Sequence, residues 1–290
     1  MSEKVYGIDL GTTYSAIAHI NDLDQPEVMK NFEGDETTPS VVFFEDESNV
    51  VVGAEAKRSQ LTEPDNTCSL IKRRMGDDYE LEFWGKSFTP ESISALTLSE
   101  LVRTANSEQG GNVSKVVITV PAYFGVREKE ATKQAGEIAG LEVVGIVTEP
   151  VAAALSVGVR GEQEETVMVY DLGGGTFDTT VMTVGPGKVD VVAIDGNRSL
   201  GGADWDQALA ELIVEKFVTQ AGLGDEDPMS DPDFEVELLS QAEDTKIRLT
   251  RRGEVKVRCR YQDKDEQVSV TRADFEEATR HLLTQTLDTA

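Results

Sequence analysis

Two glycine-containing turns of this chain carry residues that could bind phosphate and a metal ion. The sequence VYDLGGGTFD (169–178) places three glycines between Asp171 and Asp178, and VYGIDLGTTYS (5–15) repeats the Asp-Leu-Gly turn at Asp9. Glycine has no Cβ, so the backbone N–H groups of such turns can approach and bind phosphate oxygens. Mg²⁺ prefers a few carboxylates together with water and phosphate oxygens. The two aspartates that end the preceding strands, Asp9 and Asp171, therefore predict a magnesium ion held through its waters.

Each turn has a simpler explanation that must be weighed against phosphate binding. DLGTT alone favours an ordinary hairpin turn, whereas three consecutive glycines are more than a simple turn needs. Neither turn fits GxxxxGK[ST] or a GxGxxG sequence that opens a helix. The occurrence of both turns on matching strands is what favours a two-sided phosphate clamp.

Two further segments contain candidate site residues. In residues 117–155 a strand, a Pro-Ala-Tyr-Phe corner, a helix and a second strand lead to Glu149, just before Pro150. This places Glu149 at the carboxyl end of a strand, where α/β sheets bind ligands, although a charge at a helix start is an equal alternative. The basic cluster IKRRMG (71–76) contains Lys72, which without context favours a surface charge.

The elements that must position these residues indicate an α/β fold. Runs rich in Val and Ile predict strands at 4–10, 15–20, 41–44, 115–120, 142–147, 166–172, 178–184, 188–195, 255–261 and 266–271. Helices are predicted at 90–108, with Thr89 as N-cap, and at 126–140, 150–158, 204–221, 233–250 and 272–287. The two turns superimpose Asp9 on Asp171 and Gly11 on Gly173. This repeat indicates internal duplication, with a boundary near residues 161–165.

Composition limits the class of protein. The 290 residues include 39% hydrophobic and 28% charged residues, with a formal net charge of −27. A nucleic-acid partner is not expected, because phosphate-backbone binding needs a basic face. No apolar run is long enough to span a membrane, and no secretory signal is visible at the start. Cys68 and Cys259 favour reduced thiols over a disulfide, which predicts a cytoplasmic location. The acidic stretch 224–237 favours a solvated loop and helix start over metal binding.

With these pieces together, the chain resembles the nucleotide-binding (ATPase) domain of the 70-kDa heat-shock chaperone family, within the actin-like ATPase superfamily. The matching segments are GIDLGTTYS, IKRRMG, VITVPAYFGVREKEATKQAGEIAGL, VTEPVAAAL, VYDLGGGTFD and LGGADWD. The resemblance implies a duplicated actin-like (ribonuclease H-like) α/β fold, with two lobes around a nucleotide cleft. Because the family's last adenine-contacting segment, linker and peptide-binding domain have no counterpart here, we expect a second lobe that is incomplete at its C-terminal side.

The resemblance also implies a division of the chain. Residues 1–165 would form lobe I, with a core at 1–38 and 116–165 and an inserted subdomain at 39–115. Residues 166–290 would form a partial lobe II. Its core hairpins would be 166–202, its inserted subdomain 203–280, and the start of a returning helix 281–290.

Site roles follow from the same resemblance, residue by residue. Lys72 would reach the γ-phosphate and the attacking water, with Glu149, Asp178 and Thr176 as further catalytic residues. Asp9 and Asp171 would hold Mg²⁺ through water, with K⁺ nearby. The residues implied to bind ATP or ADP are Gly11, Thr12, Thr13, Tyr14, Gly173, Gly174, Gly175, Gly201, Gly202, Glu243 and Lys246.

Two classes of function remain open at this point. The leading hypothesis is an ATP-binding, slowly ATP-hydrolysing domain of a chaperone that drives nucleotide-controlled protein folding. The alternative is a non-hydrolysing nucleotide-binding or scaffold module, or a fragment too truncated to hydrolyse ATP; a small-molecule kinase is a more distant alternative. For the full-length parent, the resemblance implies a J-domain co-chaperone, a nucleotide exchange factor and unfolded client peptides as partners.

Overall fold

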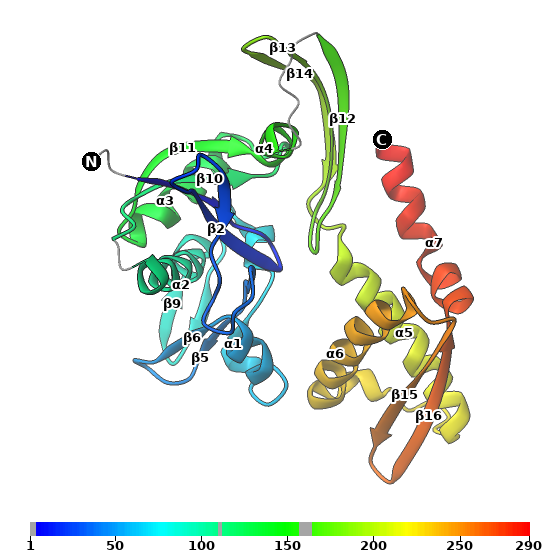
Figure 1. Ribbon diagram of the computed structural model, residues 1–290. Coiled ribbons are helices and arrows are strands. Elements are labelled where there is room, and N and C mark those ends of the chain that lie inside the picture. The colour runs from blue at the N-terminus through cyan, green and yellow to red at the C-terminus, as the bar shows by residue number, and fades with distance from the viewer. Residues whose placement is uncertain (1–3, 110–111, 157–163) are drawn as a thin grey trace.

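The structure is a computed structural model that describes residues 4–109, 112–156 and 164–290. Its elements gather into two groups with a gap between them (Figure 1). The predicted boundary near residues 161–165 lies mostly outside the described residues. We name residues 1–165 lobe I and residues 166–290 lobe II. The finer subdomain limits given above stay a prediction.

A mixed sheet forms the centre of lobe I. Its order is β11-β10-β1-β2-β3, with β4 paired to β2. The β1-β2-β3 part is an antiparallel meander, whereas β10 runs parallel to both β1 and β11. The strands are β1 (Val5–Asp9), β2 (Tyr14–Ile20), β3 (Pro26–Val28), β4 (Thr38–Pro39), β10 (Lys115–Val120) and β11 (Glu142–Thr148). Parallel pairing brings the carboxyl ends of β1, β10 and β11 to one edge.

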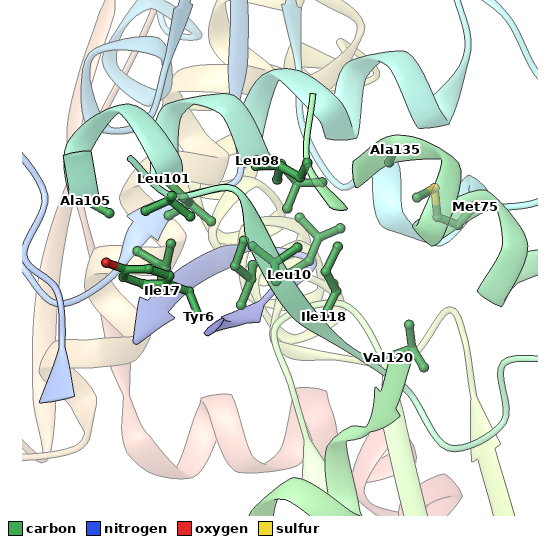
Figure 2. Close-up of a cluster of buried hydrophobic side chains, with 14 of the residues drawn as sticks. Tyr6, Leu10, Ile17, Met75, Leu98, Leu101, Ala105, Ile118, Val120 and Ala135 are labelled. Carbon is green, nitrogen blue, oxygen red and sulfur yellow. The ribbon is translucent and has the colours of Figure 1, made fainter. Parts of the chain in front are cut away.

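Two helices, α2 (Pro90–Gln109) and α3 (Val126–Ile138), cover one face of this sheet. Strand β10 alternates buried and half-buried residues, as a strand with one core face should. Figure 2 shows its Ile118 with Leu10 of the first turn and Leu98 of α2 in one apolar cluster. Burial of each such side chain contributes about 2 kcal/mol. The predicted N-cap is confirmed, since Thr89 Oγ1 accepts a hydrogen bond from Ser92 N at 3.3 Å.

Residues 42–88 of lobe I form short elements. They are β5 (Val42–Phe44), β6 (Val50–Val52), α1 (Ala54–Ser59), β7 (Thr67–Cys68), β8 (Leu81–Phe83) and β9 (Lys86–Phe88), with 3₁₀ turns η1 (Pro64–Asn66) and η2 (Ile71–Arg74). Stacked rings of Phe44 and Phe83, 4.1 Å apart, lie in their core. Only the strand at 41–44 was predicted here, because elements of two to six residues show too little periodicity to be read.

Lobe II begins with an antiparallel sheet, β12-β13-β14, which repeats the meander of β1-β2-β3. Its strands are β12 (Glu165–Leu172), β13 (Phe177–Gly185) and β14 (Lys188–Asn197). The first turn joins β1 to β2 and the second joins β12 to β13, so the predicted equivalence of the two turns is confirmed. Helix α4 (Glu149–Ser156) packs against this sheet through Ala154, which meets Met182 and Val184.

The rest of lobe II is a helical layer on a hairpin. Its elements are α5 (Gly202–Ala221), η3 (Pro228–Ser230), α6 (Pro232–Leu249), β15 (Glu254–Tyr261), β16 (Lys264–Thr271) and α7 (Arg272–Thr289). Phe217 of α5 and Phe234 of α6 stack at 5.9 Å in the core of this layer. Within the acidic stretch, Asp227 and Asp231 cap η3 and α6, which agrees with a helix start.

Every predicted strand and helix has a counterpart, so the α/β class is confirmed. Residues 157–158 of one predicted helix lie outside the described residues, and α2 ends at Gln109, one residue beyond the predicted helix at 90–108. Both cysteines are free, in agreement with the predicted thiols, and both are buried. None of the described helices is long and apolar enough to cross a membrane.

Candidate functional site

The two predicted phosphate turns face each other and touch. A Cβ added to Gly174 would lie 2.1 Å from Thr13 Oγ1, and one added to Gly175 would lie 2.2 Å from Thr12 Cγ2. Side chains of the first turn thus occupy the space beside the second. The glycines are required by this close approach, and Thr176 closes their turn by accepting a hydrogen bond from Gly173 N at 2.9 Å.

Helix α5 begins against the second turn. Gly202 N donates to Gly173 O at 2.9 Å and Ala203 N donates to Gly174 O at 2.8 Å. A Cβ on Gly201 would lie 2.5 Å from Gly175 N, so the two backbones need a glycine here. The positive end of the α5 dipole therefore lies at the second turn, an arrangement that favours anions.

The first turn is held by hydroxyl groups that the sequence analysis did not single out. Gly11 N donates to Ser15 Oγ at 3.1 Å, and Ser40 Oγ donates to Gly11 O at 2.8 Å. A Cβ on Gly11 would lie 1.9 Å from Tyr14 O. Ser15 could have been predicted from the sequence, because it directly follows a candidate phosphate turn. Ser40 lies in another segment, and nothing in the sequence indicates its contact with this turn.

Lys72 and Glu149 form a buried ion pair beside the turns. Lys72 lies in η2 and is 6% exposed, so its interpretation as a surface charge is wrong. Glu149 is the first residue of α4. Lys72 Nζ lies 2.7 Å from Glu149 Oε1. Burial raises the pKa of Glu149, the lysine opposes that rise, and the carboxylates of Asp9 and Asp171 add to it.

The aspartates predicted for metal binding and catalysis lie close to this pair. Asp9 Oδ1 accepts a hydrogen bond from Thr119 Oγ1 at 2.9 Å. Asp171 pairs with Asp178 across the β12-β13 hairpin. Burial and the nearby Asp9 carboxylate raise the pKa of Asp171. In the part of the chain described, no three His, Cys, Asp or Glu side chains group closely enough to hold a metal directly.

Asp178 gives the site a testable pH dependence. Burial, and next the Glu149 carboxylate, raise the pKa of Asp178 to about 7 from an ordinary 3.8. A carboxyl group with a higher pKa in the folded state binds a proton more tightly there, so stability is lost as the pH rises from about 4 through about 7. Asp178→Asn should remove this loss and raise the free energy of unfolding at pH 8, relative to wild type, by about 1–3 kcal/mol.

Urea unfolding at pH 5.5 and pH 8, without nucleotide or divalent metal, measures this difference. Asp195→Asn is the matched control, because Asp195 lies exposed on β14 of the same sheet. If Asp178→Asn and wild type lose the same stability between the two pH values, Asp178 does not titrate there.

A cavity of about 380 Å³ opens beside the two turns and is lined from both lobes. Seven of its lining residues were predicted to bind nucleotide: Thr12, Thr13, Tyr14, Gly174, Gly202, Glu243 and Lys246. A cavity of this size is within the range of small-molecule sites. The structure thus places the predicted phosphate side and the predicted nucleoside side of the site around one space.

Lys57, which the sequence analysis missed, bridges the lobes across this cavity. Its Nζ lies 2.7 Å from Glu243 Oε2 on α6 and 3.0 Å from the hydroxyl of Tyr14. Burial opposes the charge, but the hydrogen bonds to Glu243 and Tyr14 raise the pKa of Lys57. These two predicted nucleotide-binding residues are therefore paired with a lysine of α1, a helix too short to be predicted.

Lys246 also has a protein partner on the cavity wall. Its Nζ donates to Gly202 O at 3.0 Å and lies 2.7 Å from Asp206 Oδ1. Burial raises the pKa of Asp206, although the lysine opposes this. Asp206 belongs to the LGGADWD segment but was not singled out. The contacts tie α6 to the first turn of α5.

Comparison with known proteins decides the family. The family model described as Hsp70 protein matches residues 5–83 and 79–290. The chain belongs to the Hsp70 protein family. It is 42% identical to the chaperone protein DnaK of Thermotoga petrophila over 297 aligned residues, which cover 99% of this chain and 49% of that protein. DnaK of Thermosipho africanus is also 42% identical, with 98% of this chain and 48% of that protein covered.

Family membership confirms the predicted resemblance and, with it, the actin-like duplicated fold. The chain spans about half the length of the curated relatives it matches. That proportion fits the predicted nucleotide-binding part of an Hsp70 chaperone. The comparisons support the hypothesis of a nucleotide-binding domain of a chaperone and do not favour the scaffold alternative.

Proposed function

We propose that this chain binds ATP and ADP with Mg²⁺ between its lobes and hydrolyses ATP slowly, as the nucleotide-dependent switch of a chaperone. The observation that carries the proposal is the meeting of two glycine turns at one cavity lined from both lobes. Family membership supports it, because the matched relatives are chaperones. The acidic chain as a whole repels a nucleotide, so the turn amides, the α5 dipole and the nearby lysines must create the attraction locally.

The proposed phosphate contacts divide between the lobes. Gly11, Thr12 and Thr13 would bind from lobe I, with Tyr14 beside them. From lobe II the second turn would bind at Gly173, Gly174, Gly175 and Thr176, next to Gly201 and Gly202. The amide of Gly173 itself donates to Thr176 O and shapes this turn. Glu243 and Lys246 would contact the nucleoside side. For this, Glu243 must exchange at least part of its contact with Lys57 for the ligand.

Hydrolysis depends on few groups, because phosphoryl transfer needs mainly positioning and neutralisation of charge. Lys72 is held by Glu149 in a buried ion pair and would stabilise negative charge on the γ-phosphate. Glu149 and Asp178, both with raised pKa values, would accept hydrogen bonds from the attacking water and orient it. Because this scheme contains no strong base, we expect slow turnover.

The residues present fit a magnesium ion. Asp9, Asp171, Glu149 and Asp178 influence one another electrostatically, with Lys72 as their cationic neighbour. Asp178 Oδ1 is buried without a hydrogen-bond partner among the described residues. Asp9 and Asp171 would hold the ion through water, and the ion would neutralise charge on the phosphates. A neighbouring K⁺ is a further part of this proposal.

ATP binding and hydrolysis can be tested separately. Titration calorimetry with ATP, ADP and AMP, each with and without Mg²⁺, should show weaker binding of AMP, because the turns would bind the β- and γ-phosphates that AMP lacks. Equal affinity for AMP and ATP would contradict the phosphate clamp. Phosphate release under ATP excess measures hydrolysis. ATP binding without phosphate release would favour the scaffold alternative.

Partners and location are proposals for the whole protein. A J-domain co-chaperone, a nucleotide exchange factor and unfolded client peptides would act with the full-length parent. We propose a cytoplasmic location, which free, buried cysteines support.

A further inference from the structure

The segment that carries Lys72 is joined to lobe II by two arginines that point in opposite directions. Arg73 of η2 reaches from lobe I into lobe II, where its Nε donates to Gly175 O at 2.7 Å and its Nη2 donates to Asp204 Oδ2 at 2.7 Å. Arg198, between β14 and α5, reaches from lobe II to lobe I. Its Nη2 lies 3.2 Å from Glu128 Oε1 and its Nη1 lies 3.6 Å from Asp77 Oδ1.

The contacts of Arg73 fall on the phosphate turn itself. Gly175 belongs to the second turn, and Asp204 also accepts a hydrogen bond from Gly201 N at 2.7 Å, at the start of α5. One guanidinium therefore holds both parts of the junction between the second turn and α5. The side chains of Arg73 and Asp204 are only 19% and 29% exposed. Partial burial and two donors in a fixed fork make this a stronger contact than an exposed ion pair.

Arg198 completes the connection from the other side. Asp77 follows η2, and Glu128 lies in the first turn of α3. Gly76, between them in space, has a φ of +77°, and a Cβ there would lie 3.1 Å from Glu128 N. Gly76 thus lies against the start of α3, and the segment is connected to lobe II at Arg73 and at Asp77, with Lys72 next to the first of these connections.

We propose that Arg73 and Arg198 are positioning residues that form an interlobe clasp. The clasp sets the separation of the lobes around Lys72 and keeps the second turn against the first. No contact of either arginine with the nucleotide is needed for this role. The effect on nucleotide release rests on the proposed function, whereas the effect on lobe separation does not.

Lobe separation can be measured without nucleotide. Spin labels on Gln134→Cys in α3 and Asp263→Cys in the β15–β16 turn place one exposed reporter in each lobe. Burial raises the pKa of Cys68 to about 11 and that of Cys259 to about 12, so the natural thiols should label slowly. Arg73→Ala with Arg198→Ala should broaden the electron–electron distance distribution and move it to longer distances.

The matched control is Arg103→Ala, because Arg103 pairs with Glu100 within α2 and lies over the ring of Phe32, both in lobe I. It should leave the distances unchanged. An unchanged distribution in the double arginine variant, with circular dichroism confirming that it is folded, would overturn the clasp.

A second readout tests the consequence for the site. Release of a fluorescent ADP analogue should become about tenfold faster in Arg73→Ala, because one hydrogen bond to a charged group is worth about that factor. The release rate of Arg73→Lys should fall between those of wild type and Arg73→Ala, because an ammonium lacks the planar fork that reaches both acceptors. Unchanged release from Arg73→Ala would overturn the effect on the site. If wild type binds no ADP, the proposed function fails, and the distance measurement still decides the clasp.

Discussion

Replacing Lys72 with alanine is expected to lower the rate of ATP hydrolysis by about 100-fold or more, because a fixed charge in a dry site contributes strongly to stabilising the transition state. The structure places this ammonium in a buried pair with Glu149, next to the carboxylates of Asp9 and Asp171. ATP binding should weaken less, since the turn amides remain. Single-turnover phosphate release and calorimetry measure the two effects separately.

The control for this prediction separates chemistry from folding. Lys72→Ala leaves Glu149 buried without its partner and should cost about 2–3 kcal/mol of stability, limited by proton uptake at Glu149. Lys72→Ala combined with Glu149→Gln should recover most of that stability without recovering hydrolysis. If Lys72→Ala hydrolyses ATP at the wild-type rate, Lys72 has no role in the reaction.

Replacing Gly174 with valine is expected to weaken ATP binding by about 100-fold, the loss of about two hydrogen bonds to a charged phosphate. Its Cβ would lie 2.1 Å from Thr13 Oγ1 and 2.8 Å from Thr13 Cβ, so the turns must separate or Thr13 must move. Either change moves amides and hydroxyls that would bind phosphate. Calorimetry with ATP and Mg²⁺ measures the loss.

Gly7→Ala is the matched control for this substitution. Gly7 lies in β1, and its added Cβ would meet no atom within 4 Å. It should leave the affinity for ATP unchanged. Unchanged affinity in Gly174→Val would contradict the role of the second turn.

The sequence predicted the parts of the fold with strong local patterns. The strands of the central sheet alternate or run apolar, and α2 begins at Thr89-Pro90 as a helix start should. The short strands and α1 in residues 42–88 were largely missed, because their stability comes from tertiary contacts such as the Phe44–Phe83 stack. Local propensity carries little of that information.

The glycine turns of the site could be recognised from the sequence, because consecutive glycines lose much conformational entropy on folding and are more than a simple turn needs. Lys72 needed the family resemblance, because nothing around it in sequence indicates burial beside Glu149, 77 residues away. Lys57, Asp206 and Arg73 were missed for the same reason. Their partners, including Glu243 and Asp204, come from distant segments, and an isolated Lys or Arg is usually a surface charge.

The contact between the two turns has a kinetic consequence. Because Thr12 and Thr13 fill the space beside Gly175 and Gly174, this arrangement leaves no room for phosphates directly between the two turns. Binding would then begin from a minor conformation in which the turns have separated, and the bound state would be reached by population shift. In rapid mixing, the observed rate should approach a plateau at high ATP concentration, set by how often the two backbones part.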